Sequence, residues 1–101
     1  MKYGLSERSY RELMDILSSS PEIEKAVLYG SRARGDNGPG SDIDLSLHGV
    51  QLTRRVLSRL SDRFYYSHIP YFIDMHVYSD IRNPLFKENV DRDGITIYVR
   101  E

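Results

Sequence analysis

The chain has 101 residues, of which 40% are hydrophobic and 29% charged, with a formal net charge of −1 at pH 7 and no cysteine. These values predict one domain spanning residues 1–101 and exclude a disulfide framework, which suits a cytoplasmic protein. The near-neutral charge argues against a broad nucleic-acid-binding surface, and no apolar run is long enough to cross a membrane.

The first predicted element is an amphipathic helix that begins at Ser6 or Ser9, either of which can cap it. Its apolar stripe repeats at helical spacing through Tyr10, Leu13, Met14 and Leu17. The run Ser-Ser-Ser-Pro at 18–21 ends this helix. Residues 24–29 then predict a first strand.

The next segment contains a turn, a glycine-rich loop and a second strand. Gly30-Ser31 forms the turn, one helical turn follows at 32–34, and residues 35–41, with three glycines and a proline, form the loop. In the strand at 42–48, Asp42 and Asp44 alternate with apolar residues. Side chains two residues apart leave the same face of a strand, so the two carboxylates project together.

A second long helix is predicted at 52–64, with several arginines that favour a solvated face over a nucleic-acid or acidic-partner contact. The alternating strand at 71–78 carries Asp74 in its middle, and Asp80 at its end is a competing acid. A short helix at 81–90, with Asn83-Pro84 at or near its start, a turn at 91–94 and a strand at 95–99 follow. This alternation predicts an α/β (α+β) domain with a mixed sheet of about four strands and helices packed against it.

The two adjacent carboxylates repel each other and require a cation, for which Mg²⁺ is the natural candidate. Gly30-Ser31 offers close backbone approach, a free N–H and a hydroxyl, which are the groups that bind a phosphate oxygen. If the strand carrying Asp74 neighbours the strand carrying Asp44, Asp74 joins the pair as a third carboxylate. A phosphate site beside a metal-binding carboxylate pair indicates phosphoryl or nucleotidyl transfer.

The run Gly30-Ser31-Arg32-Ala33-Arg34-Gly35, followed by Ser41-Asp42-Ile43-Asp44-Leu45, resembles the signature of the DNA polymerase β-like nucleotidyltransferase superfamily. The small size further resembles its minimal (MNT) branch, whose members are typically encoded beside a HEPN-domain protein and act as antitoxins. The resemblance implies the polymerase β-like nucleotidyltransferase fold. It also implies a hetero-oligomer with a HEPN toxin as the partner and AMP transfer from ATP to a tyrosine of that toxin.

The resemblance also implies the roles of individual residues. Asp42, Asp44 and Asp74 are expected to be catalytic and to bind Mg²⁺ in a two-metal site, with Asp74 as the base. The expected nucleotide-binding residues are Gly30, Ser31 and Arg34. Arg32 is expected either to contact phosphate or a partner, or to face solvent.

Other kinds of site are less consistent with the sequence. No Gly-x-x-x-x-Gly-Lys-Ser/Thr motif is present, and the three histidines lack the spacing of zinc ligands. The alternative function is a non-catalytic antitoxin that neutralises its HEPN partner by binding alone. Eight tyrosines are many for this length, and core positions are favoured for them over an exposed subset at a protein interface.

Overall fold

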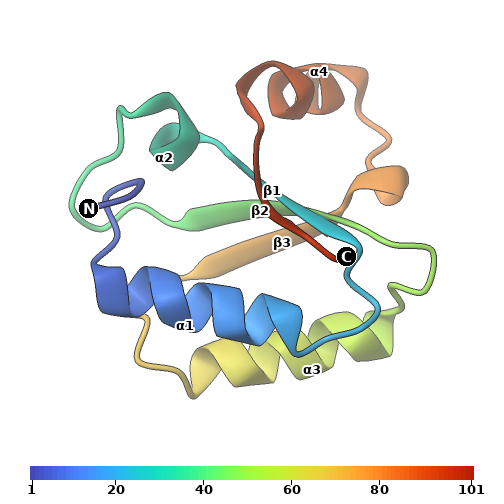
Figure 1. The fold of residues 1–101 in the computed structure, drawn as a ribbon. Helices are drawn as coiled ribbons and strands as arrows, with labels where there is room; N and C mark the ends of the chain where they lie inside the picture. Colours follow the sequence, from blue (N-terminus) through green and yellow to red (C-terminus); the bar gives the residue numbers. More distant parts are fainter.

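Helices and strands alternate along the chain, and the computed structural model describes all 101 residues (Figure 1). In chain order the elements are α1 (Glu7–Ser18), β1 (Lys25–Tyr29), α2 (Ser31–Arg34), β2 (Ile43–His48), α3 (Arg54–Tyr65), β3 (Ile73–Val77), the 3-10 turn η1 (Tyr78–Asp80), α4 (Pro84–Asp93) and β4 (Ile95–Val99). None of these helices combines the length and the apolar character needed to cross a lipid bilayer.

The four strands form one mixed sheet in the order β3-β2-β1-β4. β1 pairs antiparallel with β2 and with β4, whereas β2 and β3 run parallel. A parallel pair requires a crossover connection, and α3 provides it between β2 and β3. The mixed four-stranded sheet with its packed helices confirms the predicted fold class.

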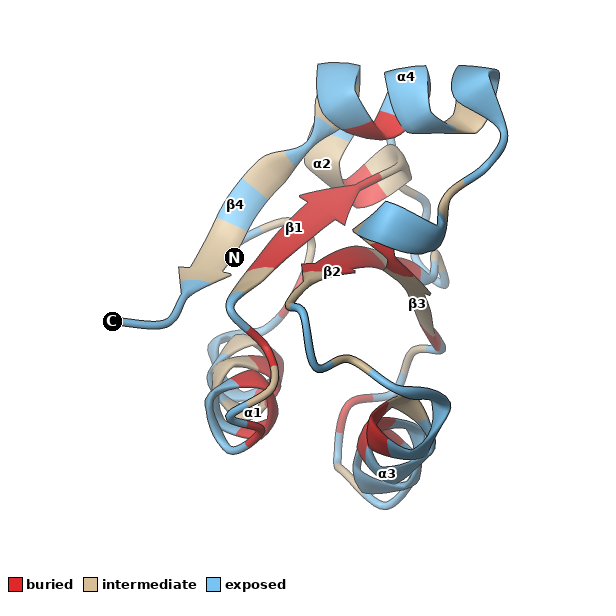
Figure 2. Cartoon of the chain, turned by 90° about the vertical axis from the view of Figure 1, so that its right-hand side faces the viewer, coloured by how far each residue is buried: buried red, intermediate tan, exposed pale blue.

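The hydrophobic core lies between the sheet and the two long helices, α1 and α3, which lie side by side against one face (Figure 2). Both helices begin at a capping hydroxyl, because Ser6 accepts a hydrogen bond from Ser9 N–H and Thr53 accepts one from Val56 N–H. Ser6 is therefore the cap of α1, and Ser9 is buried. The apolar side chains of β2 that face these helices are fully buried; they are Ile43, Leu45 and Leu47.

The opposite face of β1 is covered by α4 (Figures 1 and 2). Asn83 caps α4 by accepting hydrogen bonds from two backbone N–H groups, and Pro84 occupies the first helical position. Val90 is the one buried residue of α4, and a Cβ at Gly94 would collide with Val27 of β1. Most of α4 remains exposed, so it forms a thin cover over the face from which Asp44 projects.

The structure corrects the predicted boundaries around β3 and α4. The helix predicted at 81–90 begins at Pro84, as expected of Asn83-Pro84, but runs on to Asp93 through most of the predicted turn. Asp91 in this last part accepts a 2.7 Å hydrogen bond from the Tyr78 hydroxyl. β3 begins at Ile73 rather than at residue 71, and Tyr71 instead packs its ring against the Arg32 guanidinium. Polar turn-like residues can therefore continue a helix when the tertiary structure supplies their partners.

Candidate functional site

Side chains from three neighbouring strands form a line across the sheet, on the face opposite α1 and α3. Tyr29 on β1 is the register partner of Asp44 on β2, and Asp44 is the register partner of Asp74 on β3. Register partners project to the same face, with their Cβ atoms about 5 Å apart. Asp42, the predicted first residue of this strand, instead lies directly before β2, close enough for its charge to act on the Asp44 carboxyl. We name Asp42, Asp44 and Asp74 the acidic row.

The charges of the acidic row are only partly compensated. Burial raises the pKa of the Asp44 carboxyl, and the neighbouring charges of Asp74 and Asp42 raise it further. The positive charges of His76 and Arg34 counteract this effect more weakly. His76 Nε2 lies 3.4 Å from Asp74 Oδ2. The unbalanced negative charge favours a bound cation at this place.

The bend after β1 brings the backbone against the acidic row. Gly30 has φ +77°, and a Cβ on it would overlap the Oδ2 atom of Asp44. Only glycine combines this left-handed conformation with such a close approach at low cost. Ser31 follows directly as the first residue of α2. The predicted glycine-serine turn therefore lies beside the predicted carboxylates.

An aromatic side chain from α4 lies over the line of residues. The ring centre of Phe86 is 5.8 Å from that of Tyr29 and 5.0 Å from that of His76. Burial raises the pKa of the Tyr29 phenol, and the charges of Asp74 and Asp44 add to this effect, so Tyr29 stays neutral. Sequence reasoning assigned no site role to Tyr29 or Phe86, because their contact depends on how α4 folds back over β1. Only the position of Tyr29 directly before Gly30 could have indicated it.

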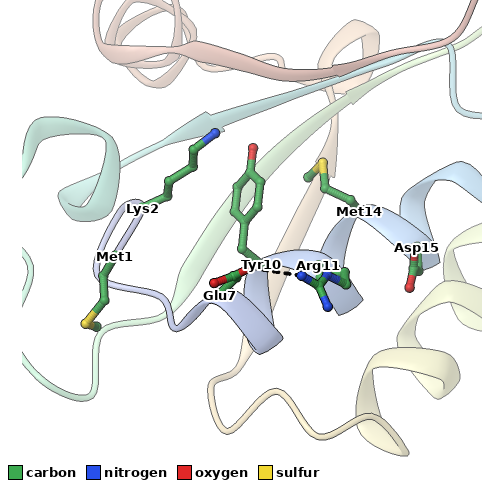
Figure 3. A pocket seen from close by; sticks show the side chains of 7 residues that line it. All are labelled: Met1, Lys2, Glu7, Tyr10, Arg11, Met14 and Asp15. Carbon is green, nitrogen blue, oxygen red and sulfur yellow. Dashed lines mark hydrogen bonds and ion pairs between the residues drawn. The ribbon is translucent and has the colours of Figure 1, made fainter.

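The largest hollow in the surface lies away from the acidic row. It measures about 710 Å³ and lies between the N-terminal residues and α1 (Figure 3). Tyr10 and Met14 line it, and the Arg11–Glu7 ion pair of 2.9 Å lies at its side. A hollow of about 400 Å³ next to β3 is lined by His76 and Phe86. The chemistry of the side chains, rather than the size of a hollow, therefore locates the candidate site.

The family of the chain is decided by a match over most of its length. Residues 11–101 match the family model described as Polymerase beta, Nucleotidyltransferase. The chain belongs to the polymerase beta nucleotidyltransferase family. No curated protein is similar enough in sequence to be counted as a relative.

Solved structures with the fold of this nucleotidyltransferase family member include antitoxins in complex with toxins. A toxin–antitoxin structure with AMP-PNP has a TM-score of 0.73 at 17% identity, covering 91% of this chain and 74% of the other. The complex of a tri-AMPylated Shewanella oneidensis HEPN toxin with its MNT antitoxin has a TM-score of 0.66 at 15% identity, covering 91% and 71%. A putative nucleotidyltransferase from Sulfolobus solfataricus has a TM-score of 0.51 at 22% identity, covering 93% and 79%. These similarities show that the fold is the predicted one.

The acidic row of this nucleotidyltransferase family member offers the oxygen ligands that Mg²⁺ prefers. No three His, Cys, Asp or Glu side chains come together closely enough to hold a metal ion by themselves. Mg²⁺ bound together with a nucleotide takes one or two carboxylates and completes its shell with phosphate oxygens and water. The adjacent, incompletely compensated Asp44 and Asp74 therefore fit a nucleotide-bound Mg²⁺ ion.

The first arginine of the motif, Arg32, has an environment that the sequence did not predict. Its side chain is 2% exposed, and its guanidinium donates hydrogen bonds to the carbonyl oxygens of Ser41 (2.7 Å) and Tyr3 (2.9 Å). The ring of Tyr71 lies 4.2 Å from the guanidinium carbon. Arg32 was expected either to contact a phosphate or a partner, or to face solvent. Its burial agrees with neither expectation. Arg32 instead joins the N-terminus, the glycine-rich loop and the segment before β3.

The second arginine, Arg34, is accessible. Its side chain is 44% exposed and forms ion pairs with Asp36 at 3.0 Å and with Asp93 at 3.4 Å. Asp80, the alternative to Asp74 as third acid, lies in η1 beyond the end of β3 and has no register partner in the acidic row. The tertiary structure thus brings Asp74, and not Asp80, beside Asp44.

Gly30→Ala is expected to lower the free energy of unfolding by about 2–3 kcal/mol, because the new Cβ combines left-handed strain with overlap on the Asp44 carboxylate. Gly35→Ala is the matched control, since Gly35 has a similar φ of +84° but no atom within 4 Å of the position that a Cβ would take. The control should lose only about 1 kcal/mol. Urea unfolding of both variants measures the difference, and equal losses would contradict the close approach to Asp44.

Proposed function

We propose that this chain transfers AMP from ATP to a hydroxyl group of a HEPN-domain partner in a Mg²⁺-dependent reaction, and thereby acts as the antitoxin of a toxin–antitoxin pair. The observation that carries the proposal is the register of Asp44 with Asp74, with the Gly30 bend packed against Asp44. This arrangement combines paired carboxylates with a backbone bend that a phosphate can approach closely.

In this proposal the acidic row holds Mg²⁺, which neutralises charge on the triphosphate and on the leaving pyrophosphate when it is bound. Asp74 accepts the proton of the attacking hydroxyl at a carboxylate oxygen. The neighbouring His76, 3.4 Å from Asp74 Oδ2, orients that carboxyl group. The α-phosphorus–oxygen bond to pyrophosphate breaks as the bond to the acceptor oxygen forms.

The terminal phosphates are proposed to bind at the turn after β1. Gly30 lets the Asp44 carboxylate lie directly beside this turn, and the Ser31 hydroxyl donates a hydrogen bond to a phosphate oxygen. Arg34 is exposed enough to reach a phosphate and now pairs only with carboxylates near the surface. The AMP-PNP complex and the AMPylated toxin among the structural neighbours support ATP as the nucleotide and a HEPN protein as the acceptor.

The test is the intact mass of the product of the neighbouring gene, the proposed HEPN-domain partner, after incubation with the purified chain, ATP and Mg²⁺. We expect one or more added AMP units, and no addition with EDTA or with the Asp42→Ala/Asp44→Ala variant. The double variant is expected to keep its fold, because removing clustered charges relieves repulsion.

Neutralisation by binding alone is the alternative function, and the same experiment separates the two. A stable complex that inhibits the partner without any mass change, and that survives the double substitution, would replace the transferase by a binding antitoxin. Measuring the toxicity of the partner together with its mass therefore distinguishes AMP transfer from neutralisation by binding alone.

A further inference from the structure

Three large aromatic side chains are exposed at one corner of the molecule. Tyr65 and Tyr66 at the end of α3 are 80% and 81% exposed, and Phe72 just before β3 is 66% exposed. We name these three residues the aromatic patch. The rings of Tyr65 and Tyr66 pack edge to face with centres 5.0 Å apart, and a hollow of about 340 Å³ is lined by Tyr65 and Phe72. The patch is therefore one continuous feature.

One residue of the aromatic patch, Phe72, lies beside the acidic row, whereas Tyr65 and Tyr66 lie at the end of α3, which packs on the other face of the sheet. The carbonyl oxygen of Phe72 accepts a 2.9 Å hydrogen bond from the backbone N–H of Ile43, the residue between Asp42 and Asp44. Phe72 also lies directly before β3, two residues before Asp74 in sequence. A surface that covers the acidic row at this end would consequently also cover Phe72.

The size of the patch is informative about what covers it. An aromatic side chain buries about 150–250 Å², so the three exposed rings present about 450 Å² of mostly apolar surface. Patches of this size on monomers are often functional. A symmetric pairing of two such patches would bury about 900 Å² in total, below the roughly 1,200 Å² of a stable interface. One side of a standard interface takes about 800 Å², of which the patch supplies roughly half.

We propose that the aromatic patch is the docking surface for the protein that receives the nucleotide. Phe72 is the residue of this surface that lies next to the acidic row. The inference rests on the proposed function, because only a protein acceptor has to place a hydroxyl at the acidic row. The same surface then both holds the acceptor protein and positions its hydroxyl beside Asp74. Tyrosine and phenylalanine anchors of this kind commonly dominate the binding energy of protein interfaces.

The test uses Tyr65→Ser/Phe72→Ser in the full chain, with the product of the neighbouring gene, the proposed HEPN-domain partner, as the probe. We expect the dissociation constant to rise at least about 30-fold, as for the loss of two interface anchors. In the transfer reaction, KM for the partner should rise with little change in kcat. The melting temperature should stay within about 2 °C of the unchanged chain, because both side chains are exposed.

Val50→Ser and Val99→Ser are the matched controls, since both remove exposed apolar side chains outside the patch. They should leave the dissociation constant unchanged. If the unchanged chain transfers AMP but the patch variant binds the partner equally well, the docking inference is wrong and the proposed function stands. If no AMP is transferred but the patch variant loses the partner, the proposed chemistry fails and the docking surface remains. Self-association of the chain that the patch substitutions abolish would overturn the inference in favour of a second copy.

Discussion

Asp44→Asn is expected to reduce AMP transfer by about 100- to 1,000-fold while raising the melting temperature at pH 7. Activity falls because the central carboxylate of the acidic row, which adjoins both Asp74 and Gly30, loses its charge. Stability rises because the substitution removes a charge that burial and two neighbouring carboxylates disfavour. The measurements are the initial rate of mass addition to the partner, and thermal unfolding in Mg²⁺-free buffer.

The pH dependence of this stability gain has a definite sign. The folded structure raises the pKa of Asp44, so the folded chain binds a proton more tightly than the unfolded chain does. The contribution of Asp44 to the stability of the unchanged protein therefore falls as the pH rises from the ordinary aspartate pKa through the raised one. The advantage of Asp44→Asn should be full above that window and should vanish below about pH 3, where aspartate is protonated in both states.

Asp62→Asn is a suitable control for both measurements, because Asp62 is exposed on α3 and takes no part in the acidic row. It should alter neither the transfer rate nor the melting temperature. A lower melting temperature for Asp44→Asn at pH 7 would show that the Asp44 carboxylate stabilises the fold, contrary to its raised pKa. Retained transfer activity would remove Asp44 from the proposed mechanism.

Arg32→Ala is expected to lower the free energy of unfolding by about 3–4 kcal/mol, the largest stability effect of any single change proposed for this chain. The substitution removes hydrogen bonds to the Ser41 and Tyr3 carbonyl oxygens. It also removes the guanidinium from the Tyr71 ring and leaves a cavity at a position that is 2% exposed. Urea unfolding monitored by circular dichroism measures the loss.

Arg34→Ala provides the comparison, because it lies two residues away on the same short helix but is 44% exposed. Its ion pairs with Asp36 and Asp93 lie at the surface, where such pairs contribute about 1 kcal/mol or less. Arg34→Ala should therefore affect the KM for ATP more than it affects stability. Equal losses of stability for the two variants would contradict the anchoring role of Arg32.

Much of the fold follows from local patterns. Alternation predicted β2 and placed its apolar residues on the core face, where Ile43, Leu45 and Leu47 are fully buried. Helical spacing predicted α1 and α3 within two residues at each end. The end of α4 was wrong, because a run of polar residues before Gly94 has the composition of a turn. In the structure the helix continues through this run, and Asp91 within it accepts a hydrogen bond from the Tyr78 hydroxyl, which local composition does not reveal.

The environment of each arginine shows the same limit. The motif contains both Arg32 and Arg34, and nothing in the neighbouring sequence indicates which of the two side chains is buried. Their difference arises because the N-terminal residues fold back to place the carbonyl oxygen of Tyr3 beside Arg32, 29 residues away in sequence. A buried polar contact over such a separation cannot be inferred from propensity or periodicity, which are local properties.

The sequence by itself determined which residues can perform the chemistry: a glycine-serine turn, two carboxylates on one face of a strand, and a third acid within an apolar strand. Only the tertiary structure decided that β3 runs parallel beside β2 in the register that makes Asp74 the partner of Asp44. It likewise decided that Phe86 covers Tyr29 and that Phe72 of the aromatic patch lies beside the acidic row. The physical reason is that alternation and helical periodicity arise from the geometry of one segment, whereas strand order and register depend on how all segments together bury their apolar faces.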